Sequence, residues 1–149
     1  MHPAQQVLEG LAAKGIRDLA IDYPFAPRLG WLEADLEGLG ASPPAVPARQ
    51  PASPETLAEL VGLLYVLEGS RLGARVIAER IRALLGDKIP GSFFDNADGE
   101  RAWPMFRHFA VTHCLMGEAE VAIRSARQAF GCFRYRLDTP LILDVSPID

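Results

Sequence analysis

The sequence predicts an all-α protein that folds as a multihelical orthogonal bundle. Apolar residues recur at steps of three and four along most of the chain, which is the period of one helix face and not of a strand. Glycines and prolines separate these periodic segments, as is typical of helix ends. The length of 149 residues suits one domain, so we expect a single unit over residues 1–149.

The first third of the chain is expected to hold two short helices. An amphipathic helix is predicted over residues 4–14, with Gly15 as its end. Residues 16–27 contain two prolines and show no regular period, so we expect a loop with extended pieces. A second helix is predicted over residues 28–39 and is ended by Gly40.

The middle of the chain is expected to be one long helix that follows a proline-rich connector. Prolines crowd residues 41–54, which excludes helix and sheet interiors and predicts an extended surface segment. The helix is predicted from Pro54 to about Leu85, with Ser53 as its N-cap and Gly86 as its C-cap. It is apolar along both halves, so we expect the other elements to pack around it.

The last third is expected to be helical up to a short tail. A loop with two adjacent phenylalanines is predicted over residues 86–99. Two helices are predicted to follow, over about residues 100–114 and 116–137. Residues 138–149 are expected to form a short, non-helical tail.

Composition and charge exclude several classes of function. The net charge of −4 offers no electrostatic basis for binding nucleic acid. No apolar run is long enough for a membrane span, and the N-terminus has no secretory signal pattern. The two cysteines, Cys114 and Cys132, have no metal-ligand spacing. We therefore expect a cytoplasmic protein that binds neither nucleic acid nor membrane.

Two glycines, Gly69 and Gly73, interrupt the middle of the long helix. Each disfavours a helix interior by ~1 kcal/mol relative to alanine, so each needs a reason. One explanation is close packing against another helix, or a simple kink. The other is a flat, bulky molecule that lies directly on the backbone, where side chains would block it. The spacing alone leaves both explanations open.

The segment around these glycines, LYVLEGSRLGARVIAERI, resembles the distal helix of heme oxygenases, particularly the bacterial type that supplies biliverdin to bacteriophytochromes. Gly69 and Gly73 match two glycines of the family's motif. Ala74 stands where the family often has a further glycine, and Ser70 where animal-type members carry an aspartate that organises distal water. Two later pairs, Phe93-Phe94 and Ala129-Phe130, also match, so the resemblance covers roughly residues 27–135.

The resemblance implies a heme oxygenase-like bundle that opens heme to biliverdin, carbon monoxide and iron. Heme would be both substrate and cofactor, and an external electron donor would supply the reductant, within a bacteriophytochrome pathway. The implied catalytic residues are Gly69, Ser70 and Gly73 in the distal-helix kink. The residues implied to bind the cofactor are Gly69, Gly73, Ala74, Arg71, Arg107 and Phe130.

The long helix also carries charged residues near its apolar stripe. Glu68 precedes the two glycines, and we expect it to pair with an arginine such as Arg71 or Arg75. A proton donor with a raised pKa is the alternative for Glu68. The arginines that follow form either a solvated basic face or a site for the carboxylates of a tetrapyrrole, since guanidinium groups match carboxylates.

One departure from the family bears on function. The family's proximal heme ligand is a histidine in its first helix, and that helix has no counterpart at the start of this sequence. None of the three histidines, His2, His108 and His113, matches the ligand position. The alternative function is therefore a non-catalytic protein of the same fold that binds a tetrapyrrole or a protein partner. We also expect a homodimer, because the lost helix would uncover an apolar strip.

Overall fold

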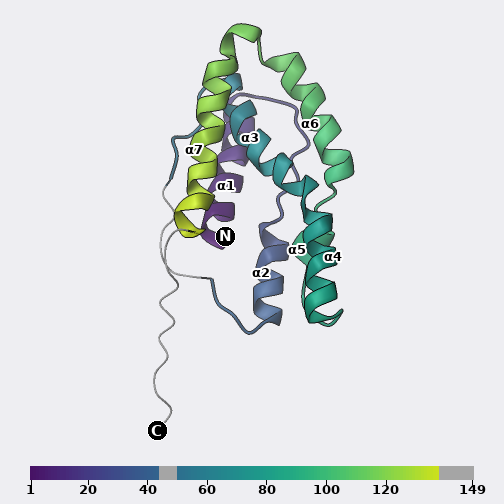
Figure 1. Ribbon diagram of the computed structural model, residues 1–149. Helices are drawn as coiled ribbons and strands as arrows, with labels where there is room; N and C mark the ends of the chain where they lie inside the picture. Colours follow the sequence, from purple (N-terminus) through teal and green to yellow (C-terminus); the bar gives the residue numbers. More distant parts are fainter. Residues whose placement is uncertain (44–49, 138–149) are drawn as a thin grey trace.

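The computed structural model describes residues 1–43 and 50–137, and every regular element within these ranges is helical (Figure 1). The all-α prediction is therefore confirmed. The expected tail over 138–149 lies outside the described residues, as do residues 44–49 of the expected connector. The elements are α1 (His2–Asp18), α2 (Leu29–Gly38), α3 (Leu57–Leu72), α4 (Ala74–Leu85), α5 (Ser92–Asp95), α6 (Gly99–His113), the 3-10 turn η1 (Met116–Glu118) and α7 (Ala119–Leu137).

The fold is arranged around α3. Helices α1, α6 and α7 pack against it, while α2, α4 and α5 form a second group at one end of the bundle (Figure 1). Because neighbours cover α3 on several sides, it is buried along most of its length. These four central helices supply most of the main hydrophobic core, including Leu8, Ala12, Leu60, Leu64, Leu67, Phe106, Phe109 and Ala129.

The start of α3 is defined by a capping box. The Thr56 side chain accepts a hydrogen bond from the backbone N–H of Glu59, at 3.2 Å, and the Glu59 carboxylate accepts one from the backbone N–H of Thr56. These two bonds satisfy donors that would otherwise be orphaned at the helix start. The N-cap expected at Ser53 is therefore wrong, since the helix begins one turn later, at Leu57.

Helix α1 continues through Gly15 to Asp18, so Gly15 is not the helix end that its sequence position predicts. A Cβ atom on Gly15 would lie 2.6 Å from Cγ of Pro54 and 3.2 Å from Cδ1 of Leu60. This glycine therefore allows α1 to approach the chain that leads into α3. Helix propensity could not reveal this, because the contact joins segments far apart in the sequence.

The expected long helix is two helices. Leu72 ends α3 and Ala74 begins α4, and Gly73 between them is a turn residue at φ −78° and ψ −12°. From this point α4 runs beside α5 and leaves the central group (Figure 1). Gly86 ends α4 with φ +85°, in agreement with its expected role as the C-cap.

The closest helix crossing in the fold lies at Gly62, where α3 meets α7. A Cβ atom on Gly62 would overlap the carbonyl oxygen of Ala122, and it would lie 2.8 Å from Cβ of Ser125. The Ser125 hydroxyl also donates a 2.7 Å hydrogen bond to the carbonyl oxygen of Glu59, which joins the two helices directly. Only glycine fits at this crossing without moving the backbone of α7.

Gly62→Ala is expected to lower the free energy of unfolding by about 2–3 kcal/mol, because the new methyl group forces α3 and α7 apart. Gly10→Ala is the matched control. Gly10 lies within α1 with no atom close to its Cβ position, so alanine there should stabilise by up to ~1 kcal/mol through helix propensity. Urea unfolding followed by circular dichroism measures both values. Equal free energies of unfolding for the two variants would show that α3 and α7 do not approach closely at Gly62.

Candidate functional site

A cavity of about 460 Å³ lies over the C-terminal end of α3, and we call it the α3 cavity. Its volume falls within the roughly 300–1,000 Å³ that is usual for small-molecule sites. Residues from α1, α3, α4, α5, α6 and α7 line it, so it lies at the junction of the two helix groups. Aromatic rings dominate its wall: Tyr65, Phe93, Phe94, Trp103, Phe130 and Phe133.

The rings of this wall contact one another in edge-to-face or tilted geometry. The centroids of Tyr65 and Trp103 lie 5.7 Å apart, and those of Phe93 and Phe94 lie 5.2 Å apart. Tyr65 and Phe130 nevertheless keep about half of their surface exposed, at 46% and 52%. Large apolar rings that pack together and still face open space are typical of a binding site and uncommon on an inert surface.

Neither Gly69, near the end of α3, nor Gly73, directly after it, is required to be glycine by close packing. A Cβ atom on Gly69 would have ordinary contact with one ring atom of Trp103, at 3.5 Å, and one on Gly73 would meet nothing within 4 Å. Close helix packing therefore explains Gly62 but does not explain Gly69 or Gly73. Gly69 borders the α3 cavity, so its missing side chain widens the space available to a ligand.

Ser70 also lines the α3 cavity, and neighbours hold its hydroxyl group in place. The hydroxyl donates a 2.7 Å hydrogen bond to the carbonyl oxygen of Leu67 and accepts one of 2.7 Å from Nη2 of Arg28. A hydroxyl has one proton and two lone pairs, so one acceptor position remains. Ser70 can therefore accept a hydrogen bond from a ligand or a water molecule while its own proton remains hydrogen-bonded to the carbonyl oxygen of Leu67.

A buried ion pair lies in α3 next to the cavity residues. Nε of Arg71 and Oε2 of Glu68 are 2.6 Å apart, and both side chains are almost fully buried. The hydroxyl of Tyr23 donates a 3.2 Å hydrogen bond to the same carboxylate. The expected pairing of Glu68 with an arginine is thus confirmed for Arg71, whereas Arg75 pairs with Glu79 and Glu100 on the surface.

Burial is the main influence on the titration of these groups. It raises the pKa of Glu68 above its ordinary value, although the nearby Arg71 acts in the opposite direction. It also raises the pKa of the Tyr23 hydroxyl, and the adjacent Glu68 carboxylate adds to this rise. Both shifts follow from placing charge where water cannot solvate it.

In addition to its ion pair, Arg71 forms hydrogen bonds with two loops. Its Nη1 donates a 2.9 Å hydrogen bond to the carbonyl oxygen of Ala97, and its Nη2 donates one to the carbonyl oxygen of Ala26. These bonds fix the loop before α2 and the loop before α6. Arg71 therefore directs its guanidinium into the protein and does not line the α3 cavity.

Two acidic residues hold helix ends that carry lining residues of the site, and no sequence pattern singled out either of them. Glu9 of α1 accepts hydrogen bonds from the backbone N–H groups of Arg28 and Leu29, at 2.7 and 3.0 Å, where α2 begins. Asp35 of α2 accepts bonds from the backbone N–H groups of Ser92 and Phe93, at 2.9 and 2.8 Å. Each carboxylate caps another element, so no local sequence signal could have revealed the role.

The other residues expected at the site are only partly brought together. Gly69, Ser70 and Phe130 share the α3 cavity. Gly73 and Ala74 lie just beyond it, and Arg107 is exposed on α6. The binding roles predicted for Gly73, Ala74, Arg71 and Arg107 stay predictions.

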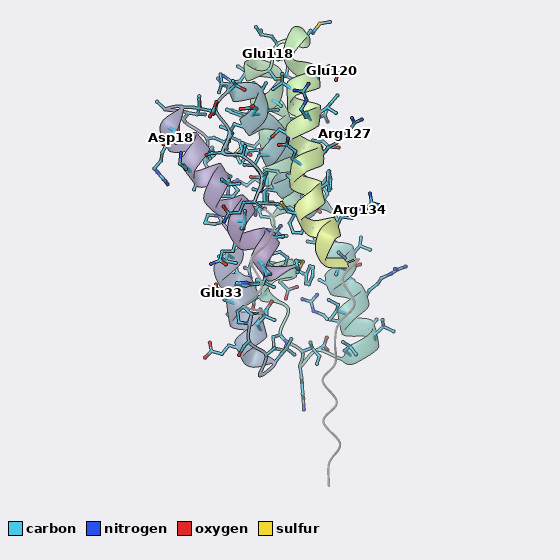
Figure 2. The ribbon with its side chains drawn as sticks, turned by 90° about the vertical axis from the view of Figure 1, so that its left-hand side faces the viewer. Asp18, Glu33, Glu118, Glu120, Arg127 and Arg134 are labelled. Carbon is cyan, nitrogen blue, oxygen red and sulfur yellow. The ribbon has the colours of Figure 1, made fainter. Side chains whose placement is uncertain are left out.

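None of the three histidines lines the α3 cavity. His2 is buried with Nε2 3.1 Å from Oε1 of Glu33, which Figure 2 labels on α2. His108 is exposed, and the ring of His113 lies 4.6 Å from that of Phe109. Within residues 1–43 and 50–137, no three His, Cys, Asp or Glu side chains gather closely enough to hold a metal ion.

No helix in the described part of the chain has the length and apolar character needed to cross a membrane.

Compared with protein-family models, with curated proteins and with solved structures, the chain matches none of them.

Arg71→Met is expected to lower the free energy of unfolding by about 3–5 kcal/mol at neutral pH, because it leaves the buried Glu68 carboxylate without its cation. The pKa of Glu68 in the folded state, already raised, should rise further. A raised folded-state pKa means that its contribution to stability is present below the unfolded pKa and is lost as the pH rises through the folded pKa. The loss should therefore be smaller near pH ~5 than near pH ~8.

Urea unfolding at these two pH values measures the effect. Arg75→Met, which removes an exposed arginine from α4, is the matched control and should leave stability unchanged at both. If Arg71→Met lowered the free energy of unfolding equally at both pH values, Arg71 would not influence the pKa of Glu68.

Proposed function

We propose that this chain is a heme oxygenase-like protein that binds heme in the α3 cavity. The observation that carries the proposal is Gly69, which lies within a buried helix, borders an aromatic cavity and has no packing reason to be glycine. The sequence resemblance independently attributes this glycine to a helix that covers one face of heme.

The wall of the α3 cavity suits a flat, apolar molecule. Aromatic side chains from four helices line the cavity together with this glycine, and Leu72 and Ile77 add aliphatic surface on the α4 side. Rings of this kind favour offset or edge contacts with another aromatic system. The exposed faces of Tyr65 and Phe130 would lose contact with water when such a ligand binds, which favours binding.

The residues present fit the body of a tetrapyrrole but not its iron. No histidine of the chain lines the α3 cavity, so none is in place as an axial ligand. Arg28 and Ser70 supply the polar groups of the wall. Binding of the ring system is therefore the function that this chain supports best by itself.

Oxidative opening of heme to biliverdin, carbon monoxide and iron is the second candidate. The open backbone at Gly69 and the fixed hydroxyl of Ser70 favour it, since both lie in the same wall. Heme, when bound, would supply the redox chemistry, and an external donor would supply electrons. The bacteriophytochrome pathway, the cytoplasmic location and the homodimer stay predictions.

Gly69→Leu is expected to weaken hemin binding by at least about tenfold, because the new side chain fills the space above the backbone of α3. Titration of the purified protein with hemin, followed at the Soret band, measures the affinity. Gly131→Leu is the matched control, since Gly131 is exposed on α7, outside the cavity, with nothing near its Cβ position. Equal affinities for both variants and the wild type would exclude the α3 cavity as the site.

Replacing His2, His108 and His113 one at a time by alanine is expected to leave the spectrum of bound hemin unchanged, because none of them lines the cavity. Absorption spectroscopy of each complex tests this, and a changed spectrum in one variant would identify an axial ligand. Addition of ascorbate to the wild-type complex then separates the two candidates. Biliverdin absorbance would support ring opening, whereas an unaltered heme spectrum would leave binding as the function.

A further inference from the structure

Arg28 is a buried arginine in the wall of the α3 cavity. Its side chain is 98% buried, being only 2% exposed, and it lies at the N-terminal end of α2. Its Nη2 donates the 2.7 Å bond to Ser70, and its Cζ atom lies 4.3 Å from the ring centroid of Phe93. Because Arg28, Ser70 and Phe93 all line the cavity, the guanidinium forms part of its polar wall.

The guanidinium of Arg28 has an unused donor group. Nη1 is buried and has no hydrogen-bond partner. An unpaired buried donor is unfavourable. At this place in the wall the protein therefore has one guanidinium donor without a matching acceptor.

The carboxylates nearest to Arg28 are engaged elsewhere. Glu9 accepts its bonds from backbone N–H groups and from the amide of Gln5, and Glu68 is paired with Arg71. Within the described residues, no ion pair joins the Arg28 guanidinium to a carboxylate. Burial, and next the nearby Arg71, lower the pKa of Arg28 to about 10, so it still carries its charge at neutral pH.

We propose that Arg28 is a recognition site for a carboxylate of the ligand, so that the α3 cavity selects a flat apolar acid over its neutral counterpart. This inference rests on the proposed function of the cavity. It assigns acid recognition to Arg28, and not to Arg71 or Arg107, whose guanidinium groups do not line the cavity.

A carboxylate suits this position in charge and in shape. Arg28 is the only charged side chain among the described residues that line the cavity, so a carboxylate there would meet a cation and no lining acid. The planar guanidinium can donate two parallel bonds to the two oxygens of a carboxylate. Ser70 accepts a hydrogen bond from Nη2 and so helps to hold the guanidinium in place, and the aromatic wall then holds the apolar body of the same ligand.

The test compares protoporphyrin IX with its dimethyl ester, which has the same ring but no ionised carboxylate. Neither compound contains iron, so the result does not depend on an axial ligand. Porphyrin fluorescence during titration with the full chain measures both affinities. We expect the wild type to bind the acid at least about tenfold more tightly than the ester, because a charge-assisted hydrogen bond is lost with the ester.

The variant Arg28→Met should bind acid and ester with nearly equal affinity. Arg75→Met removes an exposed arginine outside the cavity and should keep the full wild-type preference. Arg28→Lys retains the charge without the fork, and it should reduce the preference even if Arg28→Met does not fold.

The outcomes separate the inference from the function on which it rests. Equal binding of acid and ester by the wild type would overturn carboxylate recognition but leave the cavity as a porphyrin site. A preference that persists unchanged in Arg28→Met and Arg28→Lys would place recognition elsewhere and would also overturn it. Binding of neither compound by the wild type would overturn the proposed function itself.

Discussion

The buried pair of Glu68 and Arg71 holds together segments that are distant in the sequence. Arg71 contacts the carboxylate of Glu68 and also the carbonyl oxygens of Ala26 and Ala97, and Tyr23, in the same loop as Ala26, donates a hydrogen bond to Glu68. A charged group this deeply buried must satisfy its donors inside the protein. The loops before α2 and α6 are therefore fixed relative to α3, and the first of them leads into Arg28, which lines the α3 cavity.

The helical periodicity predicted the longer helical segments, but it missed α5 within the expected loop over residues 86–99 and did not show where each helix ends. Ends were misplaced at Gly15 and Ser53, because a long-range contact with Pro54 and a capping box at Thr56 decide them. Gly69, Ser70 and Phe130, which the family resemblance predicts at the site, do line one cavity. Arg28 could not be found in this way, because its role depends on a neighbour 42 residues away.

The apolar strip that a lost helix was expected to uncover is partly covered by α1. Leu64, Leu67 and Phe106 are buried within the chain, and α1 packs against α3 directly. Leu72, Val76 and Phe130 remain about half exposed, at 47%, 58% and 52%. The apolar strip is therefore shorter than its sequence suggests, and part of it coincides with the mouth of the α3 cavity. A ligand and a second copy of the chain would compete for that part of the surface.

Glycine serves different needs within a few turns of α3. At Gly62 the backbone of α7 leaves no room for a side chain, and Gly99 is likewise pressed against the backbone of Arg71, with a Cβ position 2.5 Å from its carbonyl oxygen. At Gly69 a methyl group would only make ordinary contact with Trp103, and at Gly73 it would meet nothing, so the fold itself would tolerate it at both. Folding therefore requires glycine at the first two positions, whereas at Gly69 only the proposed ligand would require it. In a set of variants selected only for solubility, Gly62 would therefore be retained, whereas Gly69 would be replaced by other residues.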